Sequence, residues 1–177
     1  MRLSVVDGEA DAALVSEAKE LARKADVVLY FFGLNEISES EGLDRTHLRI
    51  PQNQIDTLNA IAEANPNVVG VISAGSSIEM PWEDKCKAIL HSYLTGQAGA
   101  AAQLDLLCGR ACPSGKLTET YPIAYEDTPA SGYYPAKERN SDYREGIYVG
   151  YRYYETRYED MVLGNTTGFD YSKIVAY

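Results

Sequence analysis

Two apolar runs decide the fold: residues 25–33, ADVVLYFFG, and residues 68–75, VVGVISAG. Each run has the length of one strand and lacks polar alternation, which predicts strands buried on both faces of a parallel sheet. Residues 51–66, PQNQIDTLNAIAEANP, separate them and repeat apolar residues at helical spacing. Pro51 suits the first turn of that predicted helix and Pro66 ends it. A strand–helix–strand unit therefore forms the centre of the chain.

The same alternation continues outward on both sides of this unit. Residues 9–24, EADAALVSEAKELARK, predict a helix before it. After it, Pro81 and Trp82 open a short helix-like piece, residues 88–94 (AILHSYL) predict a third strand, and residues 96–109 (GQAGAAAQLDLLCG) predict a helix. This order predicts an α/β fold, namely a three-layer α/β/α sandwich with a mainly parallel sheet and right-handed crossovers.

The C-terminal third has a different character. The chain holds 14 Tyr against 3 Phe and 1 Trp, and all the tyrosines except Tyr30 and Tyr93 lie after residue 120. Residues 116–146 are rich in loop-forming residues, and residues 145–160, EGIYVGYRYYETRYED, alternate well enough to predict a strand or hairpin. We expect one domain over residues 1–177, with 116–177 as its irregular, Tyr-rich part.

Charge narrows the possible partners. Sixteen Lys and Arg against 26 Asp and Glu give a formal net charge of −10, and no segment is rich in basic residues. A chain this acidic is repelled by nucleic acid and by anionic membranes, whereas a neutral sugar stays compatible. The N-terminal residues carry no apolar signal region, and no run approaches the roughly 18 apolar residues of a membrane span. We expect a cytoplasmic location.

Three cysteines are present, Cys86, Cys108 and Cys112. The C-x3-C spacing has no second cysteine pair, and the chain has only two histidines, so the ligand spacing of a zinc site is not met. We interpret the three as small, semi-buried residues of a reducing compartment.

Carboxylates are concentrated in the loop that follows the first predicted strand. Residues 33–50 contain Glu36, Glu39, Glu41 and Asp44. Functional loops gather at the carboxyl ends of strands in open α/β sheets, so one of these groups could serve as a general acid/base. The other interpretation, which residue chemistry alone favours, is a solvated loop whose acids pair with nearby arginines. The chain has no phosphate loop, dinucleotide loop or nucleophile elbow.

Four segments form a recognisable series when they are taken in order. They are ESEGLDRTHLRIPQNQ (39–54), ANPNVVGVISAGSSIEMPW (64–82), AILHSYLTGQAGAAAQLDLLCGRACPSGKLTETYP (88–122) and YREGIYVGYRYYE (143–155). This series is similar to the second domain of glycoside hydrolase family 3, a family of β-glucosidases, β-xylosidases and related exo-acting enzymes. The resemblance runs from about residue 25 to about residue 157. Residues 155–177 look like the segment that precedes a fibronectin-like domain in bacterial members.

The resemblance implies a retaining mechanism with two carboxyl groups, which in such enzymes lie roughly 5–5.5 Å apart. In the family, an aspartate on a separate (β/α)8 barrel is the nucleophile. A glutamate from a loop of the sandwich domain is the acid/base, and the active site lies between the two domains. The substrate implied is a β-glucoside or oligosaccharide with a terminal β-linked glucosyl residue. No redox cofactor and no metal is implied.

Some family members place the acid/base in an S-G-E-G-x-D-R context. The matching stretch here is residues 39–45, ESEGLDR, which makes Glu41 the candidate acid/base. Glu39 and then Glu36 are the alternatives. Glu39, Asp44 and Arg45 are candidate substrate-binding residues, although Asp44 and Arg45 are better explained as an ion pair that shapes the loop.

No stretch of this sequence matches the barrel. The favoured explanation is a piece of a longer β-glucosidase, and the other is a subunit that pairs with a separate barrel chain. In either case we expect the isolated chain to be inactive. A non-catalytic carbohydrate-binding or docking module is the alternative function, with Trp82 and tyrosines of residues 143–158 stacking on sugar rings. For Trp82 we expect a packing role instead.

Overall fold

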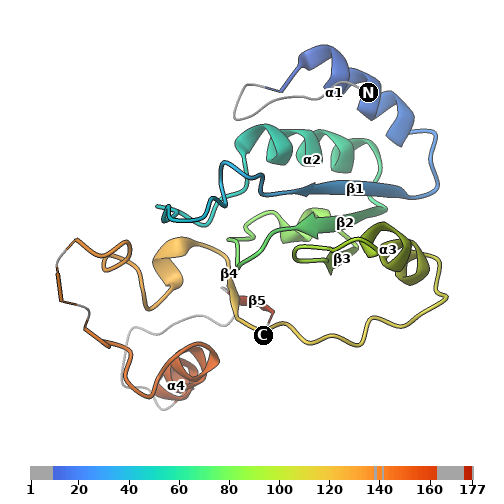
Figure 1. The fold of residues 1–177 in the computed structure, drawn as a ribbon. Coiled ribbons are helices and arrows are strands. Elements are labelled where there is room, and N and C mark those ends of the chain that lie inside the picture. The colour runs from blue at the N-terminus through green and yellow to red at the C-terminus, as the bar shows by residue number, and fades with distance from the viewer. Residues whose placement is uncertain (1–9, 138, 141, 163–173, 177) are drawn as a thin grey trace. The chain divides into compact units, whose positions relative to one another are not determined.

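The computed structural model describes residues 10–137, 139–140, 142–162 and 174–176 (Figure 1). The chain divides into two compact units. Unit 1 contains the residues up to Glu41 together with 49–76 and 82–114, and unit 2 contains residues 42–48, 77–81 and those from Gly115 onward. The expectation of one domain over residues 1–177 stays a prediction.

Unit 1 is built on an open parallel sheet, which confirms the α/β fold class. Its strands are β1 (Val28–Gly33), β2 (Val68–Ser73) and β3 (Ala88–His91), in the order β1-β2-β3. All three fall within the predicted apolar runs. Val28 lies opposite Val68 in the first pair of strands. Parallel pairing brings the carboxyl ends of β1 and β2, and the loops that follow them, to the same edge.

The helices of unit 1 also match the predicted segments. They are α1 (Ala12–Ala22), α2 (Gln52–Ala64), the short η1 (Glu83–Lys85) and α3 (Gly99–Leu107). Figure 1 shows α1 and α2 stacked on one side of the sheet. The Asp11 carboxylate caps α1 by accepting the Ala13 backbone N–H at 2.9 Å. Leu58 and Ile61 of α2 are buried, as the helical spacing predicts.

Strand β1 differs from its prediction because only one of its faces is well covered. Phe32 is buried and its ring packs edge-on against Trp82, with the ring centroids 5.0 Å apart. Its neighbours on alternate positions, Leu29 and Phe31, are 47% and 57% exposed. They point to the opposite face, which the described residues of unit 1 leave half open. The expectation of burial on both faces is therefore wrong for this strand as it stands.

Unit 2 contains short elements and a small core. Strand β4 (Tyr121–Pro122) pairs antiparallel with β5 (Ile174–Ala176), and η2 (Tyr125–Asp127) follows β4. Its buried apolar residues include Ile78, Met80, Tyr121 and Tyr154.

The strand or hairpin predicted over residues 145–160 is wrong. The chain instead forms the helix α4 (Tyr151–Val162). The tyrosines at positions 151, 154 and 158 recur at helical spacing, while their neighbours also alternate with polar residues, so the sequence fits both periods. In the helix Tyr154 is 3% exposed, whereas Tyr151, in the first turn, is half exposed.

The three cysteines are free, and only Cys86 is partly buried. Cys108 and Cys112 are exposed, which corrects the semi-buried interpretation for these two. They follow α3 where the chain turns outward at Gly109, whose φ is +69°. In the described ranges, no helix has the length and apolar character needed to cross a membrane.

Candidate functional site

The acidic loop starts at a fixed point on the carboxyl edge of the sheet. The Leu34 amide donates to the Ser73 carbonyl at 2.9 Å, which extends the pairing of β1 with β2 by one bond. Gly33 has a φ of +148°, and a Cβ there would lie 1.9 Å from the Ser73 oxygen. Only glycine fits this position without displacing the neighbouring strand. Its amide donates to the Gln54 side chain at 2.8 Å.

Asn35 folds the next residues into a tight turn. Its side-chain oxygen accepts the backbone N–H groups of Ile37 at 3.1 Å and Ser38 at 2.9 Å, and also the Ser38 hydroxyl at 3.0 Å. Its carbonyl accepts the Glu39 amide at 3.0 Å. Asparagine favours such turns because its short side chain bonds the backbone two and three residues on. The main chain is therefore defined as far as Glu39.

Glu39 joins the loop after β1 to the loop after β2. Its Oε2 accepts the Gly75 backbone N–H at 2.8 Å, and its Oε1 accepts the Ser76 hydroxyl at 3.0 Å. Both carboxylate oxygens thus have a partner within unit 1. Glu39, a predicted site residue, therefore binds neighbouring residues of its own chain.

Glu36 and Glu41 have different surroundings from Glu39. Both side chains are exposed, and within the described residues neither carboxylate accepts a hydrogen bond. Glu36 lies inside the Asn35 turn, whereas Glu41 is the last residue of this segment of unit 1, two residues beyond the Glu39 contact. In the same described part, no three His, Cys, Asp or Glu side chains converge to hold a metal ion.

Asp44 and Arg45 belong to unit 2, where each has a partner. The Tyr134 hydroxyl donates to Asp44 Oδ1 at 2.6 Å, and this bond is the main cause that raises the pKa of Tyr134. Arg45 Nη2 donates to the Ser77 carbonyl at 2.8 Å. The ion pair expected between Asp44 and Arg45 stays a prediction.

Sequence reasoning missed one carboxyl group, that of Glu119. It is half-buried in unit 2, and this burial raises its pKa, although a backbone hydrogen bond from Ser77 and the charge of Arg45 act in the opposite direction. The available signal was the alternation of Leu117, Glu119 and Tyr121, which places the carboxyl on the same side as two apolar residues.

Trp82 is a packing residue, as expected. It is 4% exposed and covers Phe32, so its ring is not available to stack on a sugar.

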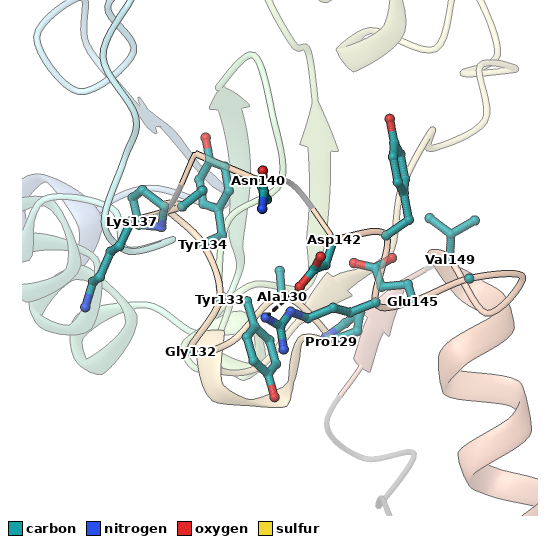
Figure 2. A pocket seen from close by; sticks show the side chains of 15 residues that line it. Pro129, Ala130, Gly132, Tyr133, Tyr134, Lys137, Asn140, Asp142, Glu145 and Val149 are labelled. Atoms are coloured by element: carbon teal, nitrogen blue, oxygen red, sulfur yellow. Dashed lines mark hydrogen bonds and ion pairs between the residues drawn. The ribbon is translucent and has the colours of Figure 1, made fainter.

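A hollow of about 470 Å³ lies within unit 2 (Figure 2). Its lining includes three tyrosines and several charged or polar side chains: Tyr133, Tyr134, Tyr143, Lys137, Asn140, Asp142, Arg144 and Glu145. The Arg144 guanidinium lies over the Tyr133 ring, 4.3 Å from its centroid, and Arg144 Nη2 is 3.1 Å from Asp142 Oδ2. Arg144 therefore covers one face of that ring.

Comparison with known proteins places the chain in a family. A sequence profile described as the glycosyl hydrolase family 3 C-terminal domain matches residues 4–151. The thermostable β-glucosidase B of Acetivibrio thermocellus is 44% identical over 163 residues, which are 92% of this chain and 22% of that protein. An exo-α-(1→6)-L-arabinopyranosidase of Bifidobacterium breve is 50% identical over 148 residues, 83% of this chain and 20% of that protein.

Solved structures agree with these sequence matches. The chain is similar to the crystal structure of a family 3 β-glucosidase of Bifidobacterium adolescentis, with a TM-score of 0.80 and 47% identity over 86% of this chain and 23% of that one. A Kluyveromyces marxianus β-glucosidase in complex with glucose has a TM-score of 0.79 and 34% identity, over 85% of this chain and 18% of that one. The chain spans about a fifth of the length of the curated relatives it matches.

Proposed function

Because this chain belongs to glycoside hydrolase family 3 and matches the C-terminal domain of that family, we propose that it supplies the general acid/base of a retaining glycosidase and that Glu41 is this residue. The observation that carries the choice is that Glu39 and Glu41 differ in their hydrogen bonds. Both Glu39 oxygens accept hydrogen bonds, from Gly75 and Ser76, whereas Glu41 is exposed and follows the anchored part of the loop.

In this proposal Glu41 acts twice. It first donates its proton to the glycosidic oxygen while a nucleophilic carboxylate attacks the anomeric carbon. It then accepts a proton from the water that hydrolyses the glycosyl–enzyme intermediate. A general acid of this kind works best with a pKa near the pH of the reaction. In such sites, burial under the substrate and a neighbouring carboxylate raise the pKa of the acid toward that value.

The nucleophile is proposed to come from a (β/α)8 barrel, present in the same polypeptide or as a separate chain. The length of the relatives supports this, since this chain corresponds to 22% of the first relative. The half-exposed Leu29 and Phe31 also support it, because apolar side chains next to one another on a sheet are usually covered by further protein.

The proposed substrates are β-glucosides or oligosaccharides that end in a β-linked glucosyl residue. The names of most relatives support this class. The relative named an exo-α-(1→6)-L-arabinopyranosidase matches at 50% identity, so α-L-arabinopyranosides are the second class to test. Relatives with two different named specificities thus have similar C-terminal domains. This supports the proposal that the barrel makes most of the contacts with the sugar ring.

The test uses a chimera of the Acetivibrio thermocellus β-glucosidase in which this chain replaces the matching segment. We expect hydrolysis of cellobiose, whose leaving sugar needs a proton, and a loss of about 10²- to 10⁴-fold in kcat/KM on it for Glu41→Gln. Glu36→Gln, an exposed glutamate of the same loop, is the matched control and should retain activity. Full activity of Glu41→Gln would refute the assignment.

The alternative function, a carbohydrate-binding module, has one observation in its favour, the tyrosine-lined hollow of unit 2. Calorimetry of the chain with glucose and cellobiose tests it. Binding that is lost in Tyr133→Ala would support the module, and absence of heat at millimolar sugar would dismiss it.

A further inference from the structure

On the N-terminal side of Glu41, the Glu39 side chain joins the loop after β1 to the loop after β2. Glu39 is the last residue before Glu41 that the described hydrogen bonds fix. Its carboxylate binds Gly75 and Ser76, which are distant from it in the sequence. Gly75 follows the end of β2 by two residues, so the contact joins two neighbouring loops at the carboxyl edge of the sheet. Without it, the Asn35 turn would be tied to the sheet only through Leu34.

The receiving end of this contact is shaped for a carboxylate. A Cβ at Gly75 would lie in van der Waals contact with both Glu39 oxygens, at 3.4 Å, so the carboxylate sits directly against this stretch of backbone. A backbone N–H and a hydroxyl are the two donors, one for each oxygen. Hydrogen bonds to an ionised acceptor are stronger than neutral ones, which suits a contact that has to hold a loop.

We infer that Glu39 is a positioning residue, which holds the loop after β1 against the loop after β2 and thereby sets the place of Glu41. This inference rests on the proposed role of Glu41. Proton transfer to a glycosidic oxygen requires the acid within hydrogen-bond reach of it, and a misplacement of about 1 Å can cost about 10²-fold in rate. One serine separates the two glutamates, so movement of Glu39 is passed directly to Glu41.

The first arm of the test measures amide hydrogen exchange in the 177-residue chain. We expect the Gly75 and Ser38 amides to exchange about tenfold faster in Glu39→Ala, because Gly75 loses its acceptor and the Asn35 turn that protects Ser38 is loosened. Glu39→Gln keeps one acceptor oxygen, so its exchange rates should lie between those of the original chain and Glu39→Ala. Ser76→Ala should remove part of the protection from exchange. Glu36→Ala is the control and should leave both amides unchanged. Unchanged exchange in Glu39→Ala would overturn the inference, whatever Glu41 does.

The second arm is a double-mutant cycle in the chimera described above. We expect Glu39→Ala to lower kcat/KM by about 10- to 100-fold in the presence of Glu41, and to have no further effect once Glu41→Gln is in place. Additive losses would mean that Glu39 acts without Glu41, which contradicts the positioning role. A silent Glu41→Gln would instead refute the proposed function, so the two failures are distinguishable.

Discussion

Two glutamates separated by one serine have opposite surroundings in the acidic loop. Glu39 is held by the Gly75 amide and the Ser76 hydroxyl, while Glu41 is exposed. A group that hydrogen-bonds its own protein stabilises the loop, and a group without such partners can meet a substrate. On this difference we propose distinct roles for two residues that composition alone would treat as equivalent.

At the same scale, Cys86 should react slowly with alkylating reagents. Burial raises the pKa of its thiol to about 11, so only about one thiol in a thousand is ionised at pH 8. Cys108 and Cys112 are exposed. With iodoacetamide at pH 8, we expect both to be alkylated at least about tenfold faster than Cys86, as measured by peptide mass spectrometry. Equal rates at the three sites would contradict the burial of Cys86.

Glu119 should lower stability at neutral pH. Burial raises the pKa of its carboxyl, so the folded chain binds this proton more tightly than the unfolded chain does. Its stabilising contribution is therefore complete below the unfolded pKa near 4.5 and is lost as pH rises through the folded value. We expect Glu119→Gln to raise the urea midpoint at pH 7 more than at pH 4. A lower midpoint at pH 7 would show that Arg45 dominates instead.

At the scale of the element, β1 places two adjacent phenylalanines on opposite faces of the sheet. Phe32 is 8% exposed and packs on Trp82, whereas Phe31 is 57% exposed. We expect Phe32→Ala to lower the free energy of unfolding by about 3–5 kcal/mol and Phe31→Ala by less than about 1 kcal/mol. Urea denaturation of the isolated chain measures both. Similar losses would mean that the outer face of β1 is covered in solution.

Most elements of unit 1 could be predicted because their periods are unambiguous. The strands β1 and β2 are short apolar runs, and α2 has apolar residues on one face between two prolines. The helix α4 could not be identified, since its tyrosines fit a period of two and a period of 3.6. Tyr154 is buried within unit 2, and that tertiary packing is not visible in either period.

The candidate site was predictable in part. The carboxyl end of β1 marks the loop, and the ESEGLDR motif singles out Glu41. The contact of Glu39 with Gly75 could not be predicted, because it depends on the register of β1 with β2. Glu119 was missed since the alternation of Leu117, Glu119 and Tyr121 is short and lies in a loop-rich segment.

At the scale of the whole molecule, the proposed reaction needs more protein than this chain contains. The chain corresponds to about a fifth of the length of its relatives, and the proposed nucleophile belongs to a barrel outside it. We therefore expect the isolated chain to hydrolyse no aryl β-glucoside, and activity to require a barrel of the same family.

The most direct test of the central claim is the leaving-group dependence of the chimera carrying Glu41→Ala. An enzyme without its acid/base should still cleave 2,4-dinitrophenyl β-glucoside, because the dinitrophenolate departs without a proton. On cellobiose it should lose at least about 10²-fold in kcat/KM. We predict this split, together with restored turnover in azide and formation of a β-glucosyl azide. An equal loss on both substrates with no rescue by azide would contradict the assignment of Glu41 as the acid/base.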